Sequence, residues 1–353
     1  MNSIASSKAQ PNNAWLFDIV KVSDSLAVST STNNIAIFDT ETLAIRQNIQ
    51  KAHEDVITGL VNSNDANLIY SSSRDGTVKC WDMRSRQAIR NYRPTAGVLS
   101  VAHHPALDKV AVGTELKGTD AIVSVYDSRS PNALVSYPDS HGEDVTSLSW
   151  HMHNNLLLSG GGDGIINVID TTVVDEDDAI LQVFNHGSSI HLAQFVGKNE
   201  VLAFSHMETA SLYKMSYNQE EVPRDEVKEF GDVRSKLAMD YAISFGAGAP
   251  ATLFTGSSAG HISIIPFNIS TMEFEPDQRI DMESGTEVIR SVHVDHAPDS
   301  LSGPLLYAAS EDGILRAYSK HGSITEDAKV ARKKERRESK SAKKKDTLRF
   351  EPY

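Results

Sequence analysis

Lys51 to Asp82 reads KAHEDVITGLVNSNDANLIYSSSRDGTVKCWD, and Ser140 to Asp170 reads SHGEDVTSLSWHMHNNLLLSGGGDGIINVID. In each segment a histidine precedes an aspartate by 22 positions, and a second aspartate follows 7 positions later. These residues are His53, Asp75 and Asp82 in the first segment and His141, Asp163 and Asp170 in the second. Because two independent spacings agree, the two segments are copies of one structural unit.

The same interval between a turn and the end of a strand extends along the chain. The expected turn residues are Thr32, Asp75, Asp120, Asp163, Glu208, Ala259 and Asp312, and the expected strand ends are Asp39, Asp82, Asp127, Asp170, Met215, Pro266 and Ser319. Successive turn residues are 43 to 53 positions apart, which is typical of four-stranded propeller blades with small insertions. The apolar runs are short, rich in Val and Ile, and separated by turn residues, which favours strands over helices. The sequence therefore predicts an all-β, seven-bladed propeller.

Two runs carry a resemblance to a known family. SSSRDGTVKCWD (residues 71–82) and GGGDGIINVID (residues 160–170) resemble WD40 repeats, with a histidine in the loop before each unit. The resemblance covers about residues 14–320 and is weaker outside the second and fourth units, where strands end in Phe38-Asp39, Tyr126-Asp127 and Tyr318-Ser319. Within this superfamily, the short N-terminus with Trp15, the weak fifth to seventh units and the C-terminal RFEPY resemble the subfamily of WD-repeat-containing protein 89.

We expect one domain with two flanking segments. Residues 1–13 are predicted to be a flexible N-terminus, residues 14–326 the propeller, and residues 327–353 a disordered basic tail. The last blade needs an outer strand, expected from Ala14–Ile19 or Ser323–Glu326. A lone cysteine, Cys80, excludes a disulfide framework and fits a reducing compartment. The N-terminus lacks a secretory pattern and no apolar run approaches membrane-spanning length, so we expect a soluble intracellular protein.

The histidines and aspartates of the repeat invite a catalytic interpretation. His53 with Asp75, and His141 with Asp163, lie near serines that could complete a Ser-His-Asp relay. The resemblance implies instead that His, Ser or Thr, Asp and Trp form a buried, hydrogen-bonded tetrad in each blade, here with His53, Asp75, Trp81, His141 and Asp163. His186 and Glu208 repeat the 22-residue spacing and predict a weakened version in the fifth unit. We predict no catalytic residue and no enzyme.

Two further patterns suggest ligand sites. Gly160–Gly164 resembles a phosphate loop, but a strand-like IINVID follows it and not a helix. Histidine pairs occur at His103/His104, His151/His153 and His293/His296. Because zinc sites gather three or four ligands, often with Cys, we interpret these as solvated loop histidines. The predictions are no cofactor and no metal.

Charge is divided unevenly along the chain. The net charge is −13, yet residues 329–353 carry 11 basic and 4 acidic residues, which leaves a net −20 on the rest. The electrostatic field of this negative charge attracts basic ligands and repels nucleic acid, so we expect no direct DNA binding by the propeller. Acidic clusters occur at Asp175–Asp178 and at Glu220, Glu221, Asp225, Glu226 and Glu229.

The tail DAKVARKKERRESKSAKKKD (residues 327–346) has no apolar periodicity and cannot bury a core. Its basic clusters resemble a bipartite nuclear import signal, with Arg332, Lys333, Lys334, Arg336, Arg337, Lys343, Lys344 and Lys345. An RNA or ribosome contact, and an autoinhibitory segment folded onto the acidic face, stay open. The expected location is nuclear, or nuclear and cytoplasmic.

The resemblance implies that a protein ligand lies across the top face, formed by the loops before each first strand and the turns before each third strand. Top-face candidates are Arg74, Glu115, Glu143, His206 and Glu311. Separately, WDMR (residues 81–84) and YDSR (residues 126–129) resemble the box by which some WD-repeat proteins dock, here through Arg84 and Arg129, onto the damage-binding adaptor of cullin-ring ubiquitin ligases. The first hypothesis is a noncatalytic, chaperone- or assembly-factor-like scaffold for a basic protein segment, and the alternative is a ligase substrate receptor.

Overall fold

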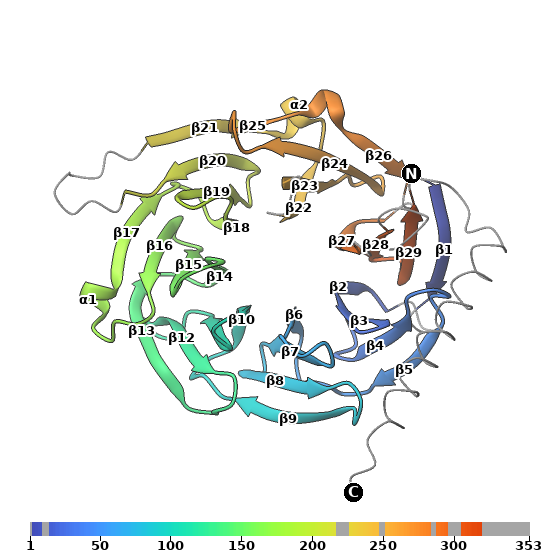
Figure 1. Ribbon diagram of the computed structural model, residues 1–353, viewed down its shortest axis with the longest axis horizontal. Helices are drawn as coiled ribbons and strands as arrows, with labels where there is room; N and C mark the ends of the chain where they lie inside the picture. Colours follow the sequence, from blue (N-terminus) through green and yellow to red (C-terminus); the bar gives the residue numbers. More distant parts are fainter. Residues whose placement is uncertain are drawn as a thin grey trace, which may run out of the picture.

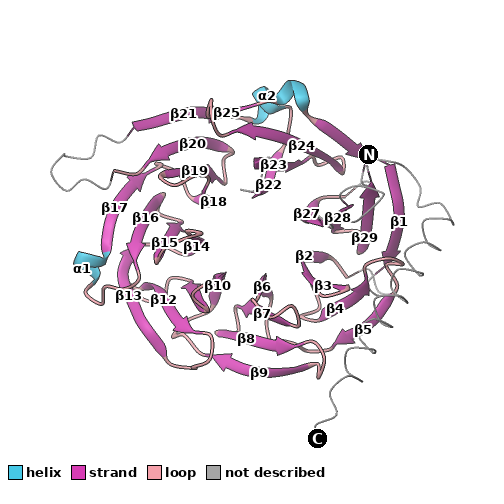
Figure 2. Cartoon of the chain, viewed as in Figure 1, coloured by secondary structure: helices cyan, strands magenta, loops and turns pink. Residues whose placement is uncertain are grey.

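The computed structural model describes residues 2–8, 14–216, 226–246, 251–283, 287–295 and 305–319. Within these residues the strands form seven antiparallel sheets, each arranged from the centre of a ring toward its rim (Figure 1). Figure 2 shows that the ring is built almost wholly from strands, with short helices only at its rim. The predicted seven-bladed propeller is confirmed.

The first four blades repeat one four-stranded arrangement. Blade 1 holds β2 (Leu16–Val22), β3 (Ser25–Thr30), β4 (Ile35–Asp39) and β5 (Ile45–Ile49). Blade 2 holds β6 (Ile57–Asn62), β7 (Leu68–Ser73), β8 (Thr77–Asp82) and β9 (Gln87–Tyr92). Blade 3 holds β10 (Val98–His104), β11 (Lys109–Thr114), β12 (Ala121–Asp127) and β13 (Ala133–His141). Blade 4 holds β14 (Val145–Trp150), β15 (Leu156–Gly161), β16 (Ile165–Asp170) and β17 (Ile180–Asn185), with helix α1 (Glu176–Ala179) before its outer strand.

The fifth blade keeps this arrangement, whereas the sixth and seventh depart from it. Blade 5 holds β18 (Ile190–Phe195), β19 (Glu200–Ser205), β20 (Thr209–Lys214) and β21 (Glu226–Asp232), followed by helix α2 (Arg234–Leu237). Blade 6 holds β22 (Tyr241–Gly246), β23 (Ala251–Gly256) and β24 (His261–Asn268), and its outer strand is split into β25 (Glu273–Phe274) and β26 (Ile280–Glu283) around the 3-10 helix η1 (Pro276–Gln278). Blade 7 holds β27 (Ile289–Asp295), β28 (Leu305–Ser310) and β29 (Ile314–Ser319).

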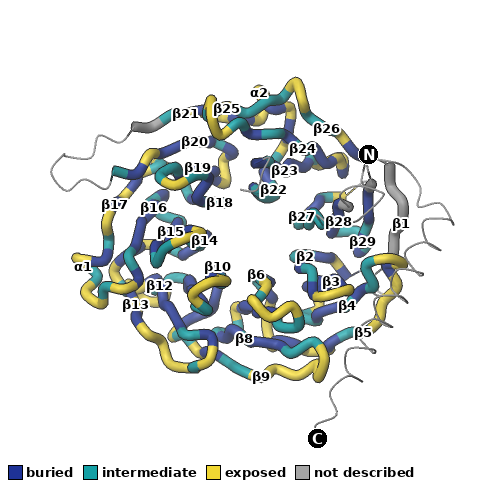
Figure 3. The backbone as a smooth tube through the Cα atoms, viewed as in Figure 1, coloured by how far each residue is buried: buried dark blue, intermediate teal, exposed yellow. Residues whose placement is uncertain are grey.

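The core lies between neighbouring blades. Every residue of β3 and of β15 is buried, because a second strand is covered on both faces by the adjacent blades. Outer strands such as β9 are half exposed, and Figure 3 shows this gradient from the buried middle to the exposed rim. Apolar clusters join two blades at a time: Ile35 of blade 1 and Ile69 and Trp81 of blade 2 share one cluster. Burial of each large apolar side chain contributes about 1.5–3 kcal/mol, so the ring is stabilised blade against blade.

Ring closure corrects one prediction. The outer strand of blade 7 is β1 (Asn2–Lys8), which pairs antiparallel with β29 from Asn2↔Ser319 to Lys8↔Ile314. Of the two segments expected there, Ala14–Ile19 leads into the innermost strand β2, and Ser323–Glu326 lies outside the described residues. The segment 1–13, predicted to be flexible, therefore contains a propeller strand. Backbone hydrogen bonds to an otherwise unpaired edge define such a strand, and they leave little apolar pattern in the sequence.

Most predicted ends of the third strands match. The structure has these ends at Asp39, Asp82, Asp127, Asp170 and Ser319 as expected, but at Lys214 in place of Met215 and at Asn268 in place of Pro266. Proline is tolerated inside β24 because its position faces the break in the outer strand: β26 pairs with His261–Ile264 and β25 with Phe267–Asn268.

Candidate functional site

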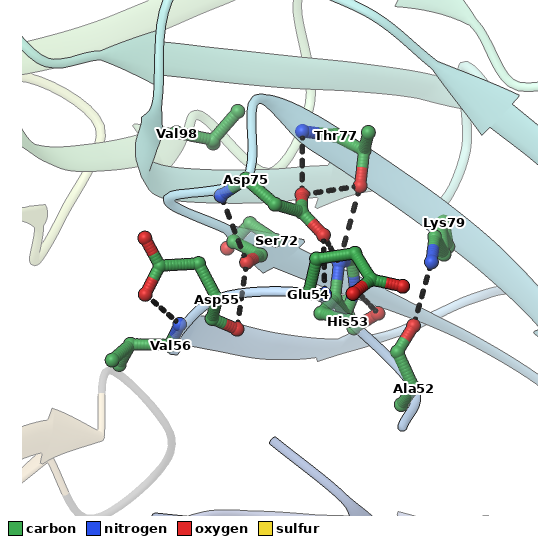
Figure 4. Close-up of polar contacts among 12 residues, drawn as sticks. Ala52, His53, Glu54, Asp55, Val56, Ser72, Asp75, Thr77, Lys79 and Val98 are labelled. Atoms are coloured by element: carbon green, nitrogen blue, oxygen red, sulfur yellow. Dashed lines mark hydrogen bonds and ion pairs between the residues drawn. The ribbon is translucent and has the colours of Figure 1, made fainter. Parts of the chain in front are cut away.

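The blade-2 tetrad is complete. His53 Nδ1 lies 2.9 Å from Asp75 Oδ2, and its Nε2 lies 2.7 Å from Ser71 Oγ. Trp81 Nε1 donates to the same Ser71 Oγ at 2.8 Å. The Thr77 hydroxyl donates to Asp75 Oδ1 at 2.6 Å, and Figure 4 shows Thr77, Asp75 and His53 converging. These bonds tie the loop before β6 to the turn before β8.

The His53 side chain is neutral in this network. Burial lowers the pKa of His53 even though the Asp75 carboxylate favours the charged ring. Burial would raise the pKa of Asp75, but hydrogen bonds from Thr77, from the Glu54 N–H and from His53 outweigh it and lower that pKa. A consistent proton arrangement runs from Trp81 N–H to Ser71 Oγ, from Ser71 O–H to His53 Nε2, and from His53 Nδ1–H to Asp75.

These distances equal those of a Ser-His-Asp relay, but the environment does not suit catalysis. Ser71 is completely buried and His53 nearly so, and the serine oxygen already accepts the indole N–H. An acyl-transfer nucleophile must reach a substrate carbonyl, which this oxygen cannot do. The relay geometry therefore serves to stabilise the blade.

Blade 4 repeats the tetrad without its aromatic member. His141 Nδ1 lies 3.3 Å from Asp163 Oδ2, and its Nε2 lies 2.8 Å from Ser159 Oγ. Ile169 stands where blade 2 has Trp81, so no indole N–H reaches the serine. Gly161 belongs to the same site, because a Cβ there would lie 2.5 Å from His141 Nδ1. The glycine-rich run thus serves packing and the turn into strand β16.

The predicted blade-5 version is wrong by one residue. His186 contacts the Thr209 hydroxyl and the Tyr213 hydroxyl, both at 2.9 Å, and not Glu208. The Glu208 N–H donates to the Ser205 carbonyl just as the Gly76 N–H donates to Ser73, and both residues have positive φ, 58° and 77°. Glu208 therefore occupies the turn glycine's position, and Met207 occupies that of the aspartate. The fifth blade has no tetrad carboxylate.

Glu208 instead joins blades 5 and 6. Its Oε2 accepts the Ala242 N–H at 3.0 Å, and His191 Nε2 lies 3.1 Å from the Ala242 carbonyl. Burial raises the pKa of Glu208 to about 7, against the opposing effects of the Ala242 N–H and of Arg234. The carboxyl group thus titrates near neutrality while it is held between two blades.

This pKa predicts a pH dependence of stability. Because folding raises the Glu208 pKa from about 4.5 in the unfolded chain to about 7, its contribution is full below pH 4.5 and is lost as pH rises through 7. Glu208→Gln keeps an acceptor for the Ala242 N–H and does not ionise. In urea unfolding, the free energy of unfolding of the variant should rise relative to that of the wild type by about 3 kcal/mol between pH 4.5 and pH 8. An equal difference at both pH values would contradict the assignment.

The five top-face candidates differ in availability. Glu143, Arg74 and His206 are exposed. Glu115 is half-buried and accepts the Gly97 N–H at 3.2 Å, and Glu311 pairs with Arg290. Of the three acids, only Glu143 makes no side-chain hydrogen bond or ion pair within the described part of the chain. The residue types alone do not distinguish the exposed candidates from those engaged in contacts.

The structure adds two acids that the sequence reasoning missed. Glu54 and Asp55 are exposed in the loop before β6, beside the blade-2 tetrad (Figure 4). Asp55 has the same place in its loop as Glu143 has before β14, each two residues after a tetrad histidine. The repeat itself could have revealed this correspondence. Glu54, Asp55 and Glu143 are named the acidic loops below.

Comparisons with known proteins agree with this geometry. Residues 10–224 match the family model described as nucleolar protein 10-like, N-terminal domain. The chain is 30% identical over 332 residues to an uncharacterized WD repeat-containing protein of Schizosaccharomyces pombe, which covers 89% of this chain and 98% of the relative. This chain belongs to the WD repeat-containing protein family.

Two other relatives of the WD-repeat chain extend the comparison. An uncharacterized WD repeat-containing protein of Saccharomyces cerevisiae is 32% identical over 305 residues, covering 85% of this chain and 77% of the relative. A WD repeat-containing protein 89 homolog of Dictyostelium discoideum is 26% identical over 335 residues, covering 90% and 86%. The expected resemblance to that subfamily is thus found. WD-repeat propellers typically act as protein-interaction scaffolds and are generally noncatalytic.

The two arginines of the WDMR and YDSR boxes are accessible in this WD-repeat propeller. The Arg84 side chain is 67% exposed and the Arg129 side chain 73% exposed. Each also pairs with the aspartate of its own box: Arg84 Nε lies 3.3 Å from Asp82, and Arg129 forms a bidentate pair with Asp127. Such exposed pairs contribute about 0–1 kcal/mol, so a partner can replace them.

The histidine pairs correct another prediction, because several members are buried and not solvated. His103 stacks on Tyr70 at 5.1 Å, and His104 packs against Trp150 at 5.3 Å. His151 packs against Phe195 at 5.1 Å. Among the described residues, no group of three or more His, Cys, Asp or Glu side chains is placed to hold a metal ion.

A cavity of about 500 Å³ lies among the first strands of blades 2 to 5, at the end of the channel opposite the tetrads. Val101, Leu148, Trp150 and Leu192 line it, and Met152 at its edge is 71% exposed. The residues that line this cavity include no Asp or Glu, in contrast to the acidic loops on the top face.

Some predicted sites lie outside the described residues. They are His296, the acids Glu220, Glu221 and Asp225, and the tail 327–353 with its basic clusters. Among the helices of the described ranges, none combines the length and apolar character needed to cross a bilayer.

Proposed function

We propose that this WD-repeat propeller is a noncatalytic scaffold that binds a basic protein segment across the top face, in the manner of a chaperone or assembly factor. The observation that carries the proposal is the set of acidic loops. Glu54, Asp55 and Glu143 are exposed, and no basic side chain of the described residues pairs with them. They project from a propeller whose acidic excess is balanced only in part by its own basic tail.

The physical consequence is attraction of cationic chains. Uncompensated carboxylates raise the encounter rate of a basic ligand and lower that of a polyanion. The tetrads hold these loops in place: the Glu54 N–H donates to Asp75 and the Gly142 N–H donates to Asp163, at 3.0 and 2.9 Å. A preordered acidic surface binds without a further loss of loop entropy.

We place this function in the nucleus. The support is the pair of basic clusters in the tail and the match of residues 10–224 to the nucleolar protein 10-like family model. Removing residues 327–353 should move a fluorescently tagged chain into the cytoplasm. An unchanged nuclear signal would show that the tail is not the import signal.

A polybasic peptide tests the acidic loops directly. Replacing Glu54, Asp55 and Glu143 with Gln, Asn and Gln should weaken binding of a fluorescent Lys/Arg-rich peptide about tenfold at low salt. The matched control, Glu41→Gln with Asp177→Asn and Asp178→Asn, removes three exposed charges elsewhere and should have little effect. Wild-type affinity should fall steeply with salt because screening acts over about 8–10 Å. Equal losses in both triple variants would contradict the placement.

A second candidate is substrate reception for a cullin-ring ligase, favoured by the exposure of Arg84 and Arg129 on consecutive blades. If it holds, Arg84→Ala with Arg129→Ala should abolish recovery of the damage-binding adaptor in pull-downs. Binding of the polybasic peptide should stay unchanged, since these arginines follow the third strands, opposite the turns of the top face. Retained adaptor binding would exclude this mode of docking.

A further inference from the structure

A cleft of about 430 Å³ opens on the top face between blades 2 and 3. Three exposed cations line it: Arg74 in the turn before β8, Arg93 after β9, and Lys117 in the turn before β12. They come from three separate segments of the chain and converge on one hollow. The cleft is thus a local concentration of positive charge on an otherwise acidic propeller.

These cations differ from most others in the structure. Arg46, Arg84, Arg129, Arg234, Arg279, Arg290 and Arg316 each pair with an Asp or Glu. Within the described ranges, neither Arg74 nor Arg93 has an ion pair, and Lys117 donates only to the Thr95 carbonyl at 2.8 Å. Two guanidinium groups therefore face the cleft with their hydrogen-bond donors unused by the described chain.

Two acids beside the cleft are already engaged. Asp75 accepts hydrogen bonds from His53, Thr77 and the Glu54 N–H within its tetrad. Glu115 accepts from the Gly97 N–H. Neither carboxylate forms an ion pair with Arg74 or Arg93, so these two acids leave the positive charge of the cleft available to an external anion.

We propose that this cleft binds the phosphorylated serine or threonine side chain of a protein partner. A phosphoryl group carries about −1.5 to −2 charge and three acceptor oxygens, which suits three converging cations better than one carboxylate does. Guanidinium forks match phosphate oxygens in bidentate geometry, and an ammonium group adds a point charge. The inference does not depend on the acidic loops binding a basic segment.

The surroundings favour a protein phosphate over a nucleic acid. Arg74 N–H donates to the Val56 carbonyl at 3.1 Å, so the loop that carries Glu54 and Asp55 borders the cleft. A polyphosphate backbone would cross those carboxylates and meet the net −20 of residues 1–328. A single phosphate on a peptide meets only the three cations, and basic residues beside it would also satisfy the acidic loops.

The test compares three versions of one degenerate peptide library on the full-length chain, with a central phosphoserine, serine or glutamate. We expect at least tenfold stronger binding of the phosphoserine library, and competition by inorganic phosphate. Arg74→Gln and Arg93→Gln should each weaken this binding about tenfold, the effect of losing one charge-assisted contact. Arg86→Gln is the matched control, since Arg86 is exposed after β8, away from the cleft, and has no ion pair among the described residues. Thermal unfolding should be unchanged in all three.

Each other outcome overturns the proposal. Equal binding of the serine and phosphoserine libraries would show that no phosphate site exists, and equal binding of glutamate would indicate a carboxylate site. A loss with Arg86→Gln as large as with Arg74→Gln would indicate unspecific attraction. Stronger binding of single-stranded RNA, lost in the same two variants, would assign the cleft to nucleic acid. The triple variant of the acidic loops should keep the preference for phosphoserine, which separates this result from the test of the scaffold function.

Discussion

Ser71→Ala should lower the free energy of unfolding by about 2–4 kcal/mol, a large effect for the loss of one oxygen atom. The Ser71 oxygen joins His53 Nε2 and Trp81 Nε1, at 2.7 and 2.8 Å, in a site closed to water. Alanine leaves both ring nitrogens buried without a partner, and each unsatisfied group costs about 1–3 kcal/mol. Urea unfolding followed by tryptophan fluorescence measures the loss.

The fourth blade supplies the control for this prediction. Ser159→Ala removes the equivalent oxygen, but only His141 Nε2 loses a partner, because Ile169 has no donor. His141 Nε2 also lies 3.4 Å from the Asn167 side-chain nitrogen. We expect about half the loss found for Ser71→Ala. Equal losses at both positions would mean that the indole bond contributes nothing to the tetrad.

Deleting residues 2–8 should destabilise the propeller by about 3–5 kcal/mol and expose β29 as an edge. Strand β1 pairs with β29 over the last blade and so joins the N-terminal end of the chain to its final described strand. Without it the ladder of β29 is left open to solvent and to other chains, which favours aggregation. Thermal unfolding and limited proteolysis measure the effect.

Rescue distinguishes ring closure from a general effect of truncation. A synthetic peptide of residues 1–8, added to the truncated chain, should raise the unfolding temperature toward that of the wild type. A scrambled peptide of the same composition should not. An unfolding temperature that is unchanged by the deletion would show that β1 does not close the ring.

Spacing predicted the tetrads where the repeat is regular and failed where it is not. In blades 2 and 4 the separations of His, Ser and Asp are identical, so the sequence was enough to identify His53 with Asp75 and His141 with Asp163. In blade 5 the same 22-residue interval pointed to Glu208. A turn that begins one residue earlier, counted from the histidine, moved Glu208 to the position of the glycine. The distance from His186 alone cannot detect such a shift. The end of β20 at Lys214, one residue before the predicted Met215, shows it.

Burial and pairing were the properties that the sequence did not show. His103 and His104 read as loop residues, but they end strand β10, and aromatic neighbours cover them. Glu311 read as an available acid, but Arg290 on the neighbouring strand neutralises it. The closing strand Asn2–Lys8 is defined by its backbone pairing with β29, so its own amino-acid sequence did not predict it. Each case depends on contacts between residues far apart in the chain.

We propose that this propeller is a scaffold whose acidic top face holds a basic partner. Affinity purification of the tagged full-length chain from its native cells, at low and at moderate salt, tests it most directly. We expect a basic protein to be recovered at low salt and lost at moderate salt. With the Glu54, Asp55 and Glu143 triple variant it should be lost at both salt concentrations. Recovery of the damage-binding adaptor and cullin at both salts, with no basic protein and no effect of the triple variant, would contradict it.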